Sequence, residues 1–449
     1  MEEAFSESDL PYQVDVVDYN NVSAEFRAII DGGNERIYAG RGGKAQNGWR
    51  KAKLGDVCDI TSSKRIFACE YRPSGVPFFR GKEIIEKQSG KPITSKLFID
   101  ESRYDEIKNK HGAPKQGDLL LTSVGTLGVP YVVQDEHFYF KDGNLTWFRN
   151  FRHTSSQFVY YWLLSPFGKR QIDSKSIGST QKALTIDALL GFEIDLPPLD
   201  EQCAIANTLS SLDNKIANNR AINHHLEQMA QAIFKSWFVD FEPWGGVMPD
   251  DWREGTLSDL GDVVGGSTPS KAKPEYYTEC GIAWITPKDL SINKNKFIAR
   301  GADDITELGL RNSSARLMPK GTVLFSSRAP IGYIAIASGE VCTNQGFKSV
   351  IPKRNVSTAF VYYFLKENLE IIEGMASGST FKEVSGAVMK VIPAVIPDDN
   401  TLCRFQADCA PIFDKQALLE GENANLAALR DALLPRLMSG EINIKEVQR

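Results

Sequence analysis

The 449-residue sequence lacks the features of membrane, secreted and zinc-ribbon proteins. It has no run of 18 or more apolar residues and no basic-then-apolar N-terminus, so we expect neither a membrane span nor a secretory signal. Its seven cysteines are scattered, odd in number and never spaced as CxxC. A disulfide framework or a zinc site is therefore not expected, and a reducing cytoplasm fits best. The adjacent His224 and His225 cannot both face one metal ion from a helix, so no metal ligand is predicted.

Motifs for catalysis are also missing. The sequence contains no GxxxxGK[ST] phosphate loop, no GxSxG nucleophile elbow and no HExxH. The string LPPL at Leu196–Leu199 superficially resembles the NPP[YF] signature of amino-methyltransferases, but it lacks the amide that would hold the target amino group. The glycine-rich strings at 31–34 and 40–44 follow no strand-to-helix pattern and are interpreted as loop. We therefore expect no catalytic residue and no cofactor bound by this chain.

Charge is unevenly distributed along the chain. The net charge is −5, but residues 1–36 hold nine acidic and two basic residues, a net charge of −7. The remainder is thus about +2, and residues 141–182 hold seven basic residues (Lys and Arg) against two acidic ones. A local basic excess is what phosphate backbones select, although a solvated surface would show it equally.

The sequence contains an internal duplication. Four strings recur after 200 to 204 residues, so one unit of about 200 residues has been duplicated. The pairs begin at Gly48 (GWRKAKLGDV) and Asp251 (DWREGTLSDLGDV), Gln116 (QGDLLLTSVGTLG) and Lys320 (KGTVLFSSRAPIG), Phe158 (FVYYWL) and Phe360 (FVYYFL), and Gly178 (GSTQK) and Gly378 (GSTFK). Such a long period excludes a solenoid and indicates two similar halves.

Each half combines a mixed α/β domain with a long helix. Short apolar runs separated by Gly, Pro and Asn predict strands, with one helix in each half at Ser155–Asp173 and Ser357–Met375. We predict an acidic extension of unknown role (1–45), a first recognition domain (46–197), a first helical spacer (198–244), a second recognition domain (245–397), a second helical spacer (398–442) and a tail (443–449).

A heptad of apolar residues marks both spacers, which favours a coiled coil, while a helix packed on its own domain remains the alternative. Polar residues at the seam centre, including Gln416, would fix its register. Pro411 predicts that the second helix starts near that residue. A helix of about 33 residues is about 50 Å long, on the order of 15 base pairs of DNA. The seam positions are Leu209, Leu212, Ile216, Asn219, Asn223, Leu226 and Ile233 in the first spacer, and Ile412, Leu419, Asn423, Leu426 and Leu433 in the second.

Polar residues in the predicted loops are candidates for DNA contact, because hydroxyl, amide and cationic groups bind phosphates and base edges. Matching positions of the two halves often keep a polar residue but change its identity, as in Arg80 matched with Thr286, whereas Asn144 is matched with Asn344. Two domains that read different sequences would show this pattern, and so would drift after duplication. The candidates are Ser63, Lys64, Arg65, Arg80, Lys82, Ser123, Asn144, Ser179, Thr180, Gln181 and Lys182 in the first half, and Ser267, Thr268, Lys271, Lys288, Ser327, Arg328, Asn344, Gln345, Ser379, Thr380 and Lys382 in the second.

The tandem organisation, the LPPLDEQ-led helix (196–202), the repeated GST-containing strings and the ending LRDALLPRLMSGEI (429–442) resemble the specificity subunit (HsdS) of type I restriction–modification systems. The resemblance covers residues 46–445. It implies an α+β protein with two tandem target-recognition domains, separated by two long helices that pair as an antiparallel coiled coil. It also implies that each domain reads half of a split, asymmetric DNA site.

The same resemblance implies partners. Two methyltransferase (HsdM) subunits would supply S-adenosylmethionine and methylate adenine, and restriction (HsdR) subunits with ATP and magnesium would add cleavage. The second half departs from the pattern, since LPPLDEQ becomes AVIPDDN (394–400), which leaves the start of the second helix open. Two other interpretations remain: a duplicated scaffold that binds only protein, and a stand-alone methyltransferase or nuclease without recognisable motifs.

Overall fold

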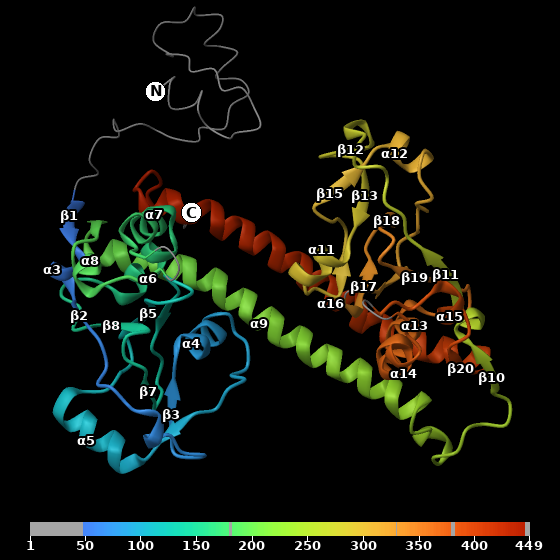
Figure 1. The fold of residues 1–449 in the computed structure, drawn as a ribbon, viewed down its shortest axis with the longest axis horizontal. Coiled ribbons are helices and arrows are strands. Elements are labelled where there is room, and N and C mark those ends of the chain that lie inside the picture. The colour runs from blue at the N-terminus through green and yellow to red at the C-terminus, as the bar shows by residue number, and fades with distance from the viewer. Residues whose placement is uncertain (1–47, 179–181, 329, 379–381, 445–449) are drawn as a thin grey trace, which may run out of the picture. The chain divides into compact units, whose positions relative to one another are not determined.

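The computed structural model describes residues 48–178, 182–328, 330–378 and 382–444 (Figure 1). The predicted acidic extension lies outside these residues, as do Ser179, Thr180, Gln181, Ser379 and Thr380. Within the described ranges, no helix combines the length and apolar character that a membrane crossing requires.

The first half contains short strands and helices followed by one long helix. In chain order the elements are β1 (Arg50–Lys53), α3 (Leu54–Val57), β2 (Asp59–Thr61), η2 (Ala68–Glu70), β3 (Val76–Phe79), α4 (Gly81–Gln88), β4 (Phe98–Ile99), α5 (Glu101–His111), β5 (Leu119–Thr122), β6 (Pro130–Val132), β7 (Tyr139–Phe140), β8 (Leu145–Arg149), α6 (Ser156–Leu164), α7 (Pro166–Lys175), α8 (Ile186–Leu190), β9 (Glu193–Leu196) and α9 (Leu199–Phe238).

The second half repeats this order with two additional strands. Its elements are η3 (Glu242–Trp244), β10 (Arg253–Thr256), α10 (Leu257–Leu260), β11 (Gly261–Gly265), η4 (Pro274–Tyr276), β12 (Tyr277–Thr278), β13 (Ile282–Ile285), α11 (Pro287–Ile292), β14 (Phe297–Ile298), β15 (Asp303–Ile305), α12 (Glu307–Arg311), β16 (Val323–Ser327), β17 (Ile331–Ala337), β18 (Val341–Thr343), β19 (Lys348–Pro352), α13 (Thr358–Glu367), α14 (Leu369–Gly374), α15 (Gly386–Lys390), β20 (Pro393–Ile396) and α16 (Asp399–Met438).

Sheet topology confirms the duplication. The sheet order β2-β8-β5-β6 of the first half returns as β11-β19-β16-β17, to which β14 is added. The pair β1-β9 returns as β10-β20, and both pairs are antiparallel. The sheet β4-β3-β7 of the first half returns as β15-β13-β18, to which β12 is added. The fold is therefore a duplicated mixed α/β domain, as the sequence predicted.

The single helix predicted in each half is divided into two helices in the structure. The stretch 155–173 divides into α6 and α7 at Ser165, and the stretch 357–375 divides into α13 and α14 at Asn368. Ser165 is the N-cap of α7, where its hydroxyl accepts a hydrogen bond from Gly168 N, and Pro166 occupies the first helical position. Proline at this position forces the preceding residue out of the helical conformation, which explains the break.

The two compact units of the chain do not coincide with the predicted domains. The first unit holds residues up to 68 with 102–203 and 436–449, and the second holds 69–101 with 204–435. The second unit therefore contains the second recognition domain and nearly all of both long helices. Residues 69–101, which the repeat assigns to the first domain, also group with it. The domain boundaries drawn from the repeat remain predictions.

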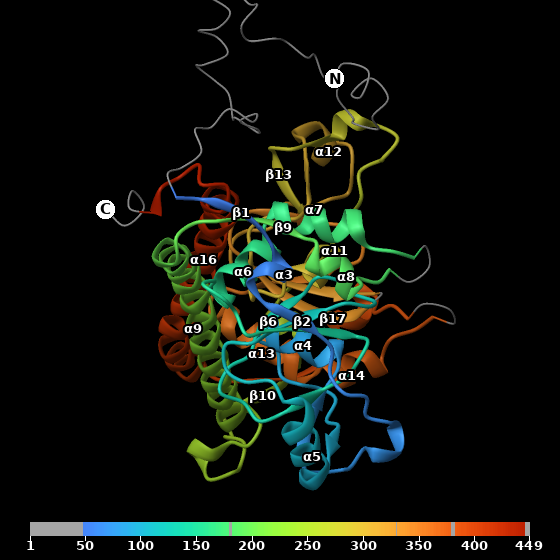
Figure 2. The ribbon, with the colours of Figure 1, turned by 90° about the vertical axis from the view of Figure 1, so that its left-hand side faces the viewer.

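The two long helices run antiparallel beside one another (Figures 1 and 2). Asp213 near the start of α9 pairs with Arg430 near the end of α16 at 2.7 Å, and Trp237 at the end of α9 packs against Phe405 near the start of α16. Midway, Asn219 Nδ2 donates to Asn423 Oδ1 at 3.0 Å. None of the twelve predicted seam residues is exposed. The predicted seam, with its central polar pair, is confirmed.

The prediction that the second helix starts near Pro411 is wrong. Helix α16 is continuous for 40 residues and contains both Pro411 and Pro435. Asp398 caps its first turn: its carboxylate accepts hydrogen bonds from Thr401 N at 3.0 Å and from the Thr401 hydroxyl at 2.5 Å. Packing of the seam thus offsets the hydrogen bond that an interior proline removes.

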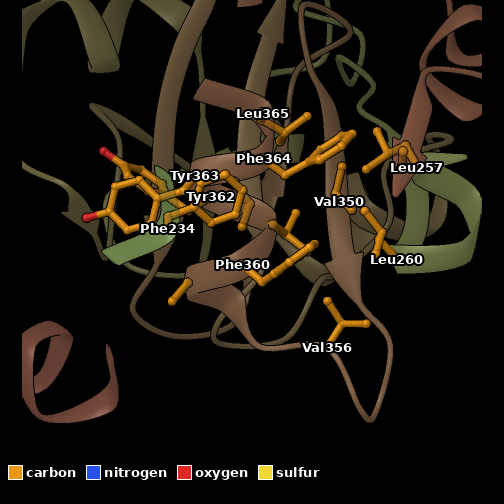
Figure 3. Close-up of a cluster of buried hydrophobic side chains, with 14 of the residues drawn as sticks. Phe234, Leu257, Leu260, Val350, Val356, Phe360, Tyr362, Tyr363, Phe364 and Leu365 are labelled. Carbon is orange, nitrogen blue, oxygen red and sulfur yellow. The ribbon is translucent and has the colours of Figure 1, made fainter. Parts of the chain in front are cut away.

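Both long helices also contribute to the core of the second domain. Phe234 of α9 lies among Phe360, Tyr362 and Tyr363 of α13 (Figure 3). Its ring centroid is 5.5 Å from that of Phe360 and 5.8 Å from that of Tyr363. The aromatic and aliphatic side chains of this cluster bind the second domain to the helix pair through burial of apolar surface.

A buried ion cluster adds to this attachment. Lys296, just before β14, is 7% exposed, and its Nζ donates to Glu227 of α9 at 2.7 Å and to Gln416 of α16 at 2.9 Å. Lys366 donates to the other oxygen of Glu227 at 2.6 Å. Burial opposes ionisation of Glu227, but the charges and hydrogen bonds of the two lysines outweigh it and lower its pKa to about 2. For Lys296 burial prevails, and its pKa falls to about 8.

Candidate nucleic-acid interface

One serine joins three loop segments in the second domain. Ser327, the last residue of β16, donates its N–H to Gly346 O at 2.8 Å and accepts from Val384 N at 3.0 Å. These hydrogen bonds join the end of β16 to the loop before β19 and to the segment that follows the repeated GST string. Since all four groups belong to the main chain, the arrangement tolerates changes of side chain.

The first domain repeats the arrangement atom for atom. Ser123 donates its N–H to Asn144 O at 2.9 Å and accepts from Leu184 N at 2.9 Å. Asn144 therefore corresponds to Gly346, and its predicted match with Asn344 is wrong. The asparagine shared by the two strings suggested an offset of 200 residues, whereas the strand register matches Phe148 with Val350.

The side chains of these two serines are not available for DNA contact. Ser123 is 3% exposed and Ser327 is fully buried. The Ser123 hydroxyl is hydrogen-bonded to the Thr146 hydroxyl, and the Ser327 hydroxyl donates to Gly346 O at 3.2 Å. Their prediction as DNA contacts is therefore wrong, because both hydroxyls are used to hold the loop junction.

The side chains around the junction differ between the domains. In the second domain Lys348 Nζ lies 3.5 Å from Ser327 Oγ and 3.2 Å from the Glu383 carboxylate, and Arg328 lies 3.7 Å from the same carboxylate. All three ion-paired side chains are partly accessible. The corresponding residues of the first domain are Thr146, Ala183 and Val124, so the junction is neutral in the first domain and ionic in the second.

The remaining candidates of the second domain surround the same junction. Ser267 donates its N–H to Thr343 O at 2.9 Å, and Asn344 donates its N–H to Ile285 O at 3.0 Å. The Thr268 hydroxyl is hydrogen-bonded to Gln345. These contacts bring the loop after β11, the end of β13 and the loop before β19 together, and they leave Gln345 exposed. Lys271 and Lys288 are exposed on the adjoining loop and on the first turn of α11.

In the first domain the loop after β2 carries three candidates. The Ser63 hydroxyl donates to Phe140 O at 2.8 Å, and the Lys64 N–H donates to the Tyr139 hydroxyl at 2.8 Å. Arg65 forms an ion pair with Asp142 at 2.8 Å, while the Lys64 side chain is exposed. The loop is thus fixed through its backbone and exposes the ammonium group of Lys64 to solvent.

Arg80 and Lys82 belong to the start of α4. Arg80 is its N-cap residue, and its guanidinium pairs with the buried Glu83 at 2.7 Å. Burial disfavours the charged form of Glu83, but hydrogen bonds from Arg80 outweigh this and lower its pKa. Exposed Lys82 donates to Ser95 at 3.0 Å. Arg80 is therefore mainly a helix cap.

In each half the repeated GST string follows the helices formed by 155–173 and 357–375 and precedes the final strand, as predicted, with the short helices α8 and α15 between the string and that strand. Gly178 and Gly378 have φ of 101° and 126°, a region that favours glycine, so both are backbone corners as expected. The described residues on either side of each string form an antiparallel bridge, Ile177 with Ala183 and Ser377 with Glu383. Lys182 and Lys382 follow the two corners and are both exposed.

Sequence reasoning missed a polar hollow of about 200 Å³ in the first domain. Its cationic side chains are those of Lys64 and Arg149, and His111 also lines it. Only Lys64 was a candidate, although Arg149 belongs to the basic excess at 141–182. The lining residues are Thr61, Ser62, Ser63, Lys64, His111, Trp147 and Arg149. Because His111 and Trp147 are distant in sequence from the loop after β2, no string could have indicated the grouping. No group of three metal-ligating side chains occurs in the part of the chain that the structure describes.

Comparison with known proteins identifies the family. The sequence model of the type I restriction modification DNA specificity domain matches residues 46–228 and 249–418, which is most of the chain and both halves. The chain belongs to this family. The second match ends at 418, within α16, and the first ends within α9.

Individual relatives agree with this assignment. The chain is 42% identical to the MjaIX specificity subunit of Methanocaldococcus jannaschii over 164 residues, 36% of this chain and 38% of that protein. It is 27% identical to the HindI specificity subunit of Haemophilus influenzae over 338 residues, 60% of this chain and 73% of that protein. A solved S subunit from M. genitalium has the same fold, with a TM-score of 0.58 at 19% identity over 88% of this chain and 97% of that one.

Proposed function

We propose that the chain is the DNA-reading subunit of a type I restriction–modification complex, in which each recognition domain reads one half of a bipartite, asymmetric site. The observation that carries this proposal is the loop junction at Ser123 and Ser327. The same two main-chain hydrogen bonds occur in both domains, whereas the side chains around them differ. A common framework with different side chains is what two readers of different half-sites require.

The paired helices set the spacing between the half-sites. At about 1.5 Å per residue, a 40-residue helix is about 60 Å long, comparable with about 17 base pairs at 3.4 Å each. Antiparallel pairing gives each domain an equivalent helix start, at Leu199 and Asp399. This pair also offers a surface for two methyltransferase subunits, one for each half.

Catalysis belongs to the partners in this proposal. The methyltransferase subunits bind S-adenosylmethionine and methylate adenine, and restriction subunits with ATP and magnesium cleave DNA. This chain contributes DNA binding, through exposed cations that contact phosphates and loop side chains that contact base edges. The complex acts in the cytoplasm. The exposed cations near the loop junctions and adjoining elements are Lys64, Lys182, Lys271, Lys288 and Lys382.

Co-expression with the methyltransferase subunits, followed by genome-wide mapping of adenine methylation, tests the proposal. The expected motif has two short defined blocks around an undefined spacer of fixed length. A complex that forms but leaves no motif would support a protein-binding scaffold. Methylation by the purified chain alone would show that it is itself a methyltransferase.

A further inference from the structure

The hollow of the first domain has the chemistry of an anion site. Its walls are the loop after β2, the end of α5 at His111 and the end of β8 at Arg149. Asp59, paired in register with Arg149, directs its carboxylate to Asn150 at 2.8 Å and to Arg152 at 2.6 Å. The lining residues include no carboxylate, so the charge in the hollow is positive.

Arg149 is held in place without a salt bridge to any described residue, although the charges of Asp59 and Asp118 act on it at longer range. Its guanidinium carbon lies 4.6 Å from the centroid of the Trp147 ring, and Nη1 makes a long hydrogen bond of 3.4 Å to His111 O. Its Nε is buried without an acceptor in the described chain. Stacking on an aromatic ring orders the side chain before any ligand binds, which lowers the entropic cost of binding.

Trp147 is itself fixed by a buried carboxylate. Its Nε1 donates to Asp118 at 2.8 Å, and Asp118 also accepts from Lys115 N at 3.1 Å. Asp118 is 2% exposed, and burial raises its pKa. Asp118 is thus a positioning residue, which acts on Arg149 through the indole.

The opposite wall supplies hydroxyl groups and a second cation. Ser62 Oγ accepts a long hydrogen bond of 3.4 Å from Gly143 N, so its proton remains available to an acceptor. Exposed Lys64 extends from the same loop. A guanidinium, an ammonium group and a hydroxyl around one small hollow match the acceptor oxygens of a phosphodiester.

We propose that this hollow binds one phosphate of the DNA backbone within the half-site of the first domain, with Arg149, Lys64 and Ser62 as its contacts. The inference rests on the proposed function. It assigns Arg149 to positioning the DNA rather than to reading a base. A backbone phosphate is favoured because its two non-bridging oxygens can accept hydrogen bonds from all three groups at once, and guanine, whose major-groove edge presents the acceptors N7 and O6, is the alternative that the test distinguishes.

The second domain has no equivalent site. The register of β11 with β19 matches Ile351 to Arg149 and Ser349 to Trp147. The loop after β11 has Gly265 where the first domain has Ser62, and Ser267 where it has Lys64. The site is therefore specific to the first domain. The substitution Arg149→Ile introduces the residue that the second domain has at the matching position, so the fold should accept it.

The test measures DNA binding by the complex with its methyltransferase subunits, on duplexes in which single phosphates of the first half-site are replaced by neutral methylphosphonates. For the unaltered complex, we expect one replacement to weaken binding about tenfold. Arg149→Ile should weaken binding of specific and unrelated duplexes alike, lower the salt slope by about one, and abolish the effect of that replacement. Lys64→Gln should have the same effects in weaker form. Because Lys64 is exposed, this substitution should not disturb folding, so it controls for a loss of binding caused by misfolding.

Arg65→Gln is the matched control, since Arg65 is an exposed arginine of the same loop that pairs with Asp142 and does not line the hollow. It should leave sensitivity to the replacements unchanged. The proposal is overturned if Arg149→Ile and the unaltered complex respond identically to every methylphosphonate. It is equally overturned if Arg149→Ile changes the preferred base in the first half-site with an unchanged salt slope. A complex without any sequence preference refutes the proposed function alone, because the salt slope on an unrelated duplex still decides the phosphate site.

Discussion

The two recognition domains share a backbone framework and differ in the charges placed on it. Around the junction serine the first domain has Val124, Thr146 and Ala183, where the second has Arg328, Lys348 and Glu383. Main-chain hydrogen bonds hold the loops in both cases, so the surrounding positions are free to change. In the proposed function, the identity of each half-site is encoded in side chains that the fold does not need.

Attachment to the helix pair differs as well. The second domain inserts Lys296 between the long helices, where it meets Glu227 and Gln416. Sheet pairing matches β4 with β15, whereas β14, which follows Lys296, is the strand added to the sheet of the second domain. A buried charge must be paired and hydrogen-bonded to be tolerated, so this attachment is specific in geometry but sensitive to loss of one partner.

The largest effect is expected for Glu227→Ala, which leaves Lys296 buried without its carboxylate. The free energy of unfolding of the chain should fall by about 3–5 kcal/mol in denaturant titration. Lys296→Leu, which removes the buried ammonium group, should cost less because Glu227 keeps Lys366. Glu367→Ala is the control: Glu367 accepts one exposed hydrogen bond from Gln231, and its loss should cost below about 1 kcal/mol.

The same cluster gives a pH signature. The pKa of Glu227 is lowered to about 2 in the folded state, from an ordinary value of 4.5. Its contribution is therefore present above about pH 4.5 and is lost as the pH falls toward 2, because protonation then favours the unfolded chain. The stability difference between the unaltered chain and Glu227→Gln should shrink over this window, and a constant difference would contradict the ionic pairing.

Glu383→Ala gives the second domain the residue found in the first. Arg328 and Lys348 then lose their carboxylate, so discrimination among bases in the second half-site should change by about 1–3 kcal/mol. The first block of the methylated motif should be unchanged. Methylation mapping checks both blocks, with Ala183→Glu as the reciprocal variant that should alter only the first.

Pro411→Ser gives α16 the residue that α9 has at Ser211. Since the interior proline removes a helical hydrogen bond, the substitution should raise the free energy of unfolding by about 2 kcal/mol. Thermal unfolding measures the gain. The reciprocal Ser211→Pro should destabilise by a similar amount, and equal stability of all three chains would contradict the cost assigned to an interior proline.

Lys182→Ala and Lys382→Ala test what the domains have in common. Each exposed lysine follows the glycine corner of its domain, and each should contribute one phosphate contact. Each single variant should lower the salt slope of DNA binding by about one and the double variant by about two, with no change in sequence preference. A change in only one half-site motif would identify that lysine as a base reader.

The repeat, the fold class and the helical seam were predictable because each leaves a periodic trace in the sequence. The unbroken α16 was not predictable. The rule that an interior proline ends a helix considers only neighbouring residues, whereas the packing of the seam that keeps α16 continuous involves the other long helix. At the junction, strings placed Ser123 and Ser327 correctly but could not show that both hydroxyls are buried. Arg149 and His111 come together only through strand register and the end of α5, so their grouping required the structure.

The most direct test of the account replaces residues 46–197 with a second copy of 245–397 and maps adenine methylation by the resulting complex. If each domain reads its own half-site, the motif should consist of two identical blocks in inverted orientation, because the long helices run antiparallel. The block read by the original second domain should be retained. A motif identical to that of the unaltered chain would contradict the account, since the first domain would then contribute nothing to recognition.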